Sequence, residues 1–320
     1  MAVHPAMRRI GVGAALTAAA FLAAPIAAQD PAADPPRTIA ATSDTSLRMA
    51  LPVHIAGQGP YAFVIDTGSQ RTILSAEIAR TLALPAGEDV RIVSLSGPAN
   101  LSTVQVAHLR YGQEEVRDLR VPVINEALLG GPGILGLDSL KDKRLDLKFR
   151  DGRIDIKDSV RHPDRSEDDG AIVVRAKSRY GQLILVNCRA AGQKVNVILD
   201  TGAQFSIGNM ALFRKLRADR LTMAPRPINL ISVTGDMVAA QVAVVKTLTV
   251  GPMTVSGVPI IFTDAAPFDT LKLSDQPAMF LGMQILRLFD GVAIDFGLKQ
   301  VDFLMPGGKG EGRGGSARAG

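Results

Sequence analysis

Two aspartates in matching sequence contexts are the residues most able to carry chemistry in this chain. Residues 63–69 read FVIDTGS and residues 197–203 read VILDTGA, so Asp66 and Asp200 each follow an apolar run and precede Thr-Gly. Two carboxyl groups within hydrogen-bond reach of each other share one proton, because both cannot be ionised at low cost. One can then act as a general base and the other as a general acid.

The flanking residues predict how each aspartate is held. The β-branched and apolar run before it is typical of a buried strand, and Gly68 or Gly202 permits a tight turn at the strand end. A single Asp-Thr-Gly would be read as an ordinary turn. After each copy comes a short helical pattern, at residues 76–84 and 210–216, preceded by Ser75 and Asn209 as helix caps.

A third element repeats in the same order. Residues 133–140 read GILGLDSL and residues 279–286 read MFLGMQIL, which gives two apolar residues, a glycine and a short helix in each half. The chain therefore contains an internal duplication of more than about 100 residues.

These motifs resemble those of the pepsin/retropepsin-type aspartic proteases. The residues that carry the resemblance are Asp66, Thr67, Gly68, Ile134, Leu135 and Gly136 in the first half, and Asp200, Thr201, Gly202, Phe280, Leu281 and Gly282 in the second. The halves are short for pepsin lobes, and Ala203 after the second triplet is more similar to retroviral enzymes, whereas Ser69 after the first is usual in pepsins. A fused pair of retropepsin-like units is therefore the closer description.

The resemblance implies an all-β fold with two β-barrel lobes related by a pseudo-twofold axis and a few short helices. It implies that Asp66 and Asp200 are catalytic, that Thr67 and Thr201 hydrogen-bond across the two loops, and that Gly68 and Gly202 offer backbone N–H groups to the carboxylates. It requires no metal and no cofactor. Because Ser69 carries a hydroxyl and Ala203 does not, we also expect Ser69 to donate to Asp66 and favour its ionised form.

Two hairpins are candidate flaps over the site. Their tips lie near residues 94–99, with Ser96 and Gly97, and near residues 232–236, with Thr234 and Gly235. The alternative for each is an ordinary surface hairpin. Neither tip carries the tyrosine of pepsin-type flaps, which favours the retropepsin comparison.

The remaining chain divides by composition. Residues 1–28 have Arg8 and Arg9, a short apolar stretch and small residues at the end, which predicts a secretory signal peptide. We expect an extended leader at 29–45, a first lobe at 46–158, a polar linker at 159–169, a second lobe at 170–306 and a disordered Gly-rich tail at 307–320. The product would be periplasmic or secreted, without a stable membrane anchor after signal cleavage.

Other chemistries find little support in the sequence. The histidines are scattered without metal-ligand spacing, and no G-x-S-x-G motif is present. The chain has 36 basic and 31 acidic residues with only 4% aromatics, so no nucleic-acid surface is indicated. The sole cysteine, Cys188, lies in a strand-like run and is expected to pack in the core.

Three functions are compatible with this pattern. The first is an aspartic endopeptidase, acting as a monomer on peptide or protein substrates. The second is a non-catalytic peptide-binding module of the cell envelope with the same fold, and the third is an envelope assembly protein without a ligand. Both aspartates are present, which favours the endopeptidase over the other two.

Overall fold

The computed structural model describes residues 38–43, 47–159, 171–251 and 253–306. The predicted signal peptide, the Gly-rich tail and all of the predicted linker except Ser159 lie outside the described residues. Within them the chain is mostly β-strand with a few short helices, which confirms the all-β prediction.

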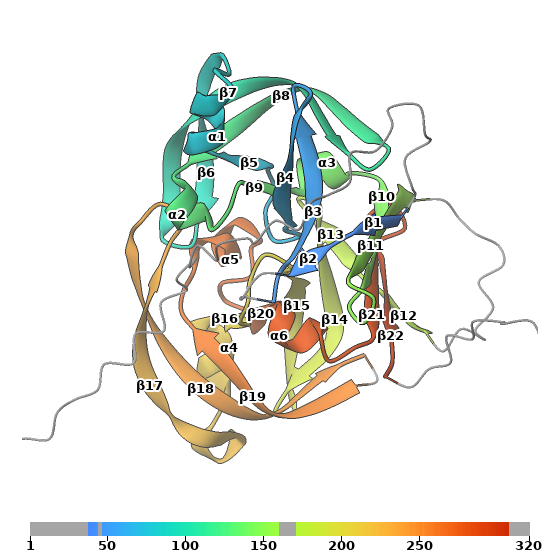
Figure 1. Ribbon diagram of the computed structural model, residues 1–320. Helices are drawn as coiled ribbons and strands as arrows, with labels where there is room; N and C mark the ends of the chain where they lie inside the picture. The colour runs from blue at the N-terminus through green and yellow to red at the C-terminus, as the bar shows by residue number, and fades with distance from the viewer. Residues whose placement is uncertain (1–37, 44–46, 160–170, 252, 307–320) are drawn as a thin grey trace, which may run out of the picture.

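The amino-terminal half forms an eight-stranded sheet, drawn at the top of Figure 1. The sheet curls back on itself because β3 also pairs with β7. In spatial order its strands are β2 (Thr42–Ser43), β3 (Met49–Ile55), β4 (Gln58–Ile65), β9 (Gly133–Leu135), β5 (Ile73–Ser75), β8 (Glu114–Ile124), β7 (Gly97–Tyr111) and β6 (Ala86–Ser94).

The carboxy-terminal half repeats this order strand for strand, at the bottom of Figure 1. Its closing pair is β14 with β18. The strands are β13 (Lys177–Arg179), β14 (Gln182–Ala190), β15 (Gln193–Leu199), β20 (Ala278–Leu281), β16 (Ile207–Gly208), β19 (Met253–Phe262), β18 (Met237–Val250) and β17 (Leu221–Ile231). Equal strand order in both halves is the structural form of the duplicated sequence.

A six-stranded sheet joins the halves. Its order is β1 (Thr38–Ala40), β11 (Arg153–Asp158), β10 (Lys143–Lys148), β21 (Gly291–Asp295), β22 (Gln300–Leu304) and β12 (Ala171–Arg175). The central pair, β10 with β21, is antiparallel and crosses from one half to the other. Strands β1 and β2 come from the stretch expected to be a leader, so among the described residues regular pairing already includes residues before the expected lobe start at residue 46.

The helices are short and begin where the sequence predicted caps. Helix α1 (Ala76–Thr81) starts after Ser75, whose Oγ accepts from the N–H of Ile78, and α4 (Met210–Lys215) starts after Asn209, whose side chain accepts from the N–H of Leu212. The others are α2 (Glu126–Leu129), α3 (Leu137–Leu140), α5 (Ala266–Thr270), α6 (Met283–Leu286) and the 3₁₀ turn η2 (Ala218–Arg220).

One hydrophobic core runs through both halves. Alternate residues of β4 and β15 point into it, and Phe63, Ile65 and Val197 are completely buried. Cys188 packs in the same core as the sequence predicted, and burial raises the pKa of its thiol to about 11. Because the core is continuous, the strands that carry the two aspartates are held in one rigid frame.

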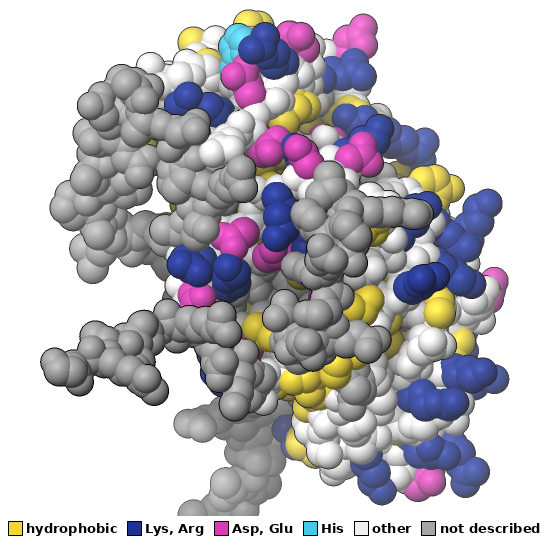
Figure 2. Space-filling model, turned by 90° about the vertical axis from the view of Figure 1, so that its right-hand side faces the viewer, with side chains coloured by type: hydrophobic (Ala, Val, Ile, Leu, Met, Phe, Trp, Pro, Cys, Tyr) yellow, Lys and Arg dark blue, Asp and Glu magenta, His cyan; other side chains and the backbone are white. Residues whose placement is uncertain are grey.

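The surface is mixed in charge. On the face shown in Figure 2, Lys and Arg side chains are dispersed and, in the upper part, interspersed with Asp and Glu. Among the described residues, no helix is long and apolar enough to cross a membrane.

Candidate active site

Each aspartate is positioned by the same strand arrangement. Strand β4 runs parallel to β9 and ends immediately before Asp66, whose N–H donates to the carbonyl of Leu135 at 3.1 Å. Strand β15 runs parallel to β20, and the N–H of Asp200 donates to the carbonyl of Leu281 at 3.1 Å. The backbone that carries each carboxyl group is therefore fixed by a neighbouring strand of its own half.

The two loops are joined by reciprocal threonine hydrogen bonds. The N–H of Thr67 donates to Thr201 Oγ1 at 3.1 Å, and the N–H of Thr201 donates to Thr67 Oγ1 at 3.2 Å. Each hydroxyl in turn donates across the interface, Thr67 to the carbonyl of Leu199 at 2.8 Å and Thr201 to that of Ile65 at 2.7 Å. The N–H and hydroxyl groups of both threonines are buried, so these four hydrogen bonds hold the two loops together in a low-dielectric environment.

The carboxyl groups face each other across this junction. Asp66 Oδ1 accepts from the N–H groups of Gly68 at 2.8 Å and Ser69 at 3.0 Å. Asp200 Oδ1 accepts from those of Gly202 at 3.1 Å and Ala203 at 3.0 Å.

Glycine is required in both loops because the opposite aspartate lies against it. A Cβ at Gly68 would lie 2.7 Å from Cγ of Asp200, and a Cβ at Gly202 would collide with the carboxyl group of Asp66. Each loop thus holds its own carboxylate with two N–H groups and makes room for the carboxylate of the other half.

The two apolar-apolar-Gly segments pack behind the loops. Ile134, Leu135, Phe280 and Leu281 are buried. A Cβ at Gly136 would collide with the backbone of Arg71, and a Cβ at Gly282 would lie 2.7 Å from the carbonyl carbon of Phe205. Because these two glycines have no side chain, the backbone that follows each aspartate loop can pack directly against them.

The two aspartates differ in proton affinity. Burial and the negative charge of Asp66 raise the pKa of Asp200 well above its usual range. Burial also raises the pKa of Asp66, but the N–H groups of Gly68 and Ser69, the charge of Arg48 and a hydrogen bond with Asp200 oppose that rise. The pair therefore favours sharing one proton, and the charge of Arg48 favours the ionised form of Asp66.

The expected role of the Ser69 hydroxyl is wrong. Its Oγ donates to the carbonyl of Arg71 at 2.8 Å, so only the backbone N–H of Ser69 reaches Asp66. The hydroxyl is used within the turn, where it stabilises the chain leading to β5.

Sequence reasoning missed two buried polar residues beside the site. Arg48 precedes β3 and is 7% exposed, and Gln182 begins β14 and is 3% exposed. Gln182 Nε2 donates to the carbonyl of Gly68 in the loop of the other half. Arg48 precedes Asp66 by the same number of residues as Gln182 precedes Asp200, so an alignment of the two repeats would have paired Arg48 with Gln182. However, neither arginine nor glutamine is by itself a signal of function.

The two candidate flap tips meet. Ser96 Oγ donates to Asp236 Oδ2 at 2.8 Å and lies 3.2 Å from Thr234 Oγ1. Leu95 packs against apolar residues of the second half, and Val233 packs against apolar residues of the first. Gly97 and Gly235 adopt positive φ angles in the two turns. Each hairpin thus reaches over to the opposite half.

A cleft of about 320 Å³ lies between the aspartates and the hairpins. Its walls include Asp66, Asp200, Leu95 and Val233, so the candidate catalytic groups and both hairpin tips border one space. A substrate that reaches the aspartates therefore contacts both halves.

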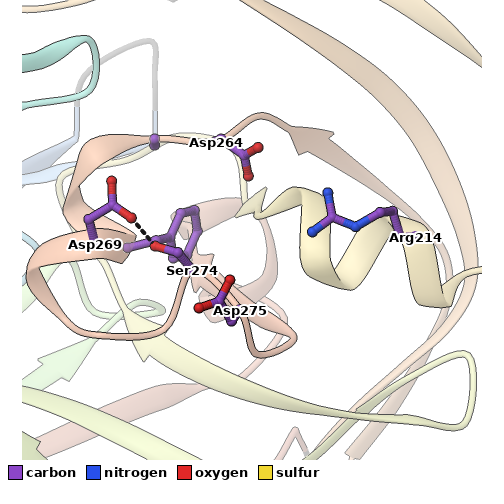
Figure 3. Close-up of a pocket in the computed structure, with 7 residues that line it drawn as sticks. Arg214, Asp264, Asp269, Ser274 and Asp275 are labelled. Atoms are coloured by element: carbon purple, nitrogen blue, oxygen red, sulfur yellow. Dashed lines mark hydrogen bonds between the residues drawn. The ribbon is translucent and has the colours of Figure 1, made fainter.

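A second hollow, of about 220 Å³, lies beside α4 and α5 in the second half (Figure 3). Two of its three acids have structural partners: Asp264 accepts from the N–H of Met210 at the start of α4, and Asp269 accepts from Ser274. Within the described part of the chain, no three His, Cys, Asp or Glu side chains are grouped so that they could hold a metal ion.

Comparison with protein families gives a match in each half. Residues 51–142 match the family described as gag-polyprotein putative aspartyl protease, and residues 186–285 match the family described as aspartyl protease. The chain belongs to the retropepsin-like aspartyl proteases and carries their domain twice. A comparison with curated proteins gave no match.

In this duplicated retropepsin-like protease, each matched region contains one aspartate loop and one apolar-apolar-Gly segment. The family comparison supports a peptidase that acts on peptides or proteins. It also agrees with the fold, because the two matched regions correspond to the two eight-stranded sheets.

Proposed function

We propose that this protein is an aspartic endopeptidase in which Asp66 and Asp200 activate one water molecule. The observation that carries the proposal is the pair of carboxyl groups, each packed against the loop of the other half and bordering one cleft. A buried, proton-sharing pair is the arrangement that general acid–base hydrolysis needs.

In this mechanism the water lies between the two carboxyl groups. Asp66 takes a proton from the water as the water oxygen attacks the peptide carbonyl carbon. Protonated Asp200 gives its proton to the carbonyl oxygen. Asp66 then passes its proton to the amide nitrogen as the C–N bond breaks, and Asp200 recovers a proton from the tetrahedral diol. Atoms and protons balance without a covalent intermediate.

The substitutions Asp66→Asn and Asp200→Asn test this proposal. An amide has nearly the same shape but cannot accept or deliver these protons, so each variant should lose at least about 10²-fold in kcat/KM while its thermal unfolding stays cooperative. Cleavage of a peptide library, read by mass spectrometry with and without pepstatin, gives the rate. Asp219→Asn, an exposed aspartate on η2, is the matched control.

Retained activity in either dyad variant would contradict the proposed mechanism. Peptide binding without cleavage by the parent protein would instead favour the peptide-binding module.

We further propose that the protein acts as an exported, periplasmic or secreted monomer without a stable membrane anchor or a nucleic-acid partner. One chain supplies both aspartates, so a complete pair needs no second copy. The amino-terminal pattern that suggests export can be tested by mass spectrometry of the mature protein, where cleavage after Ala28 is expected. Sedimentation of the active fraction tests the monomer.

A further inference from the structure

The cleft beside the two aspartates has an uneven charge. Besides Asp66 and Asp200, the charged side chains that line it are Arg71 and Arg91. Both come from the first half, Arg71 from the chain between the Asp66 loop and β5, and Arg91 from the hairpin strand β6. No further acid lines the cleft.

Neither guanidinium is neutralised by a residue in the described part of the chain. There, Arg71 and Arg91 make no side-chain hydrogen bond or ion pair, whereas other arginines of the first half do. Arg117 pairs with Glu115 at 2.7 Å, and Arg120 pairs with Glu88 at 2.8 Å. The two cleft arginines therefore keep their donors available to a bound molecule.

The backbone at Arg71 is held rigidly. Its carbonyl accepts from Ser69 Oγ, and the backbone of Arg71 packs directly on Gly136. The next residue, Thr72, donates from both its N–H and its hydroxyl to Asp138 Oδ1, at 2.8 and 2.7 Å. A side chain that starts from such a fixed point loses less conformational entropy when it binds a ligand.

The second half has no such charge at the equivalent positions. Phe205 corresponds to Arg71, because the backbone of Phe205 packs on Gly282 as that of Arg71 packs on Gly136. Phe205 lies against an apolar cluster that includes Leu230 and Ile261. Arg91 stands three residues before Ser94, and its counterpart before Ser232 is Asn229. The first half therefore lines the cleft with two cations, whereas the second half lines it with uncharged residues apart from Asp200.

We propose that Arg71, together with Arg91, binds a substrate carboxylate, so that the protease prefers an acidic group on one side of the scissile bond. The proposal rests on the proposed function and names its substrate class. An arginine in a partly enclosed site binds a carboxylate through paired, charge-assisted hydrogen bonds. The carboxylate could come from an Asp or Glu side chain or from the carboxyl terminus of the peptide, and the experiment separates these sources.

The test uses peptides that share one scissile bond, with Glu, Gln or Lys placed in turn at each of the four positions on either side. Each peptide is made with a free and with an amidated carboxyl terminus. Glu should exceed Gln by about tenfold or more in kcat/KM at positions on one side only, since a charge-assisted hydrogen bond to arginine is stronger than a neutral one. If kcat/KM rises only when the carboxyl terminus of the peptide is free, the bound carboxylate is that terminus rather than a side chain.

Arg71→Glu should reverse the preference, so that Lys exceeds Gln and Glu is cleaved slowest. Arg71→Gln should abolish the difference between Glu and Gln while uncharged peptides are still cleaved. Arg226→Glu is the matched control, because Arg226 is exposed on β17 and does not line the cleft. Equal rates for Glu and Gln at every position in the parent protein would overturn the proposal.

Binding of the same peptides to the Asp66→Asn protein, followed by fluorescence anisotropy, separates this inference from the proposed function. Tighter binding of Glu than of Gln peptides, lost in the Arg71→Gln double variant, supports the carboxylate subsite even if no peptide is cleaved. Equal binding of the Glu and Gln peptides would overturn the carboxylate subsite. If the Glu peptides bind more tightly but the parent protein cleaves no peptide, only the proposed endopeptidase activity is overturned.

Discussion

At the scale of single residues, the two aspartates receive the same backbone hydrogen bonds yet hold protons differently. Each Oδ1 accepts from two N–H groups at 2.8–3.1 Å. Besides the coupling between the two carboxyl groups, one contribution comes from a pair of repeat-related positions, where the first half has the cation Arg48 and the second has the neutral Gln182. A buried cation stabilises the ionised form of the carboxylate near it.

We therefore expect Arg48→Gln to move the acid limb of the bell-shaped rate profile to higher pH. Arg48 lowers the pKa of Asp66, so its removal raises that pKa, and activity is lost at a higher pH on acidification. Because the aspartates titrate as a coupled pair, the macroscopic acid limb of kcat/KM is the quantity to measure.

Ser69→Ala is the control for this profile. Its hydroxyl bonds to the Arg71 carbonyl, so the acid limb should stay in place. An unmoved acid limb in Arg48→Gln would show that Arg48 does not set the ionisation of the pair.

At the scale of elements, the two candidate flap hairpins hold each other across the cleft. The contact between Ser96 and Asp236 joins the tip between β6 and β7 to the tip between β17 and β18. Hydrogen bonds from Thr234 and Ser96 lower the pKa of Asp236, so the ionised carboxylate is the form that holds the tips together. The contact is exposed, so it can break and re-form as substrate enters.

Asp236→Ala should loosen this junction. We expect faster amide hydrogen exchange in residues 94–97 and 232–236, because the hydroxyls of Ser96 and Thr234 lose their shared acceptor. In the parent protein, the same two segments should also exchange faster as the pH falls through the lowered pKa of Asp236. This comparison is made after correction for the pH dependence of the intrinsic exchange rate.

Asp219→Ala, far from the tips in sequence and exposed, should leave both segments unchanged. Protection in Asp236→Ala equal to that of the parent would show that apolar packing of Leu95 and Val233 alone holds the hairpins.

At the scale of the whole molecule, the six-stranded sheet keeps the halves in register. Arg144 of β10 is 4% exposed and reaches across to the second half, where Nη2 donates to Asp302 Oδ2 at 2.7 Å and Nη1 lies 3.8 Å from Asp295 Oδ2. Its Nε donates to Asp146 at 2.7 Å. Arg144 thus links the partly buried Asp146 of its own half to the buried Asp295 and Asp302 of the second half.

Arg144→Met should therefore destabilise the protein by about 3–5 kcal/mol, because it removes the positive charge that Arg144 places beside the buried carboxylates of Asp295 and Asp302. Thermal or denaturant unfolding measures the loss. Arg153→Met removes an exposed ion pair with Asp151 and should cost less than about 1 kcal/mol. Equal losses in the two variants would contradict a special role for the buried cluster.

The sequence alone determined the features that depend on neighbours along the chain. The strand before each aspartate, the glycine turn after it and the caps Ser75 and Asn209 follow from patterns only a few residues long, and repetition of those patterns identified the pair Asp66 and Asp200. The hairpin of β10 and β11 also follows from a short local pattern, because alternating apolar residues flank the turn at Asp151 and Gly152.

The tertiary structure decided what depends on contacts between distant segments. Pairing of β1 with β11 draws residues 38–40 into a sheet although their local composition reads as a leader. Rotation about one side-chain bond turns the Ser69 hydroxyl toward Arg71 instead of Asp66. Folding brings the charge of Arg48 near Asp66 and joins Ser96 to Asp236. Such choices depend on the balance of burial, charge and hydrogen bonding among residues far apart in sequence, which a local pattern does not encode.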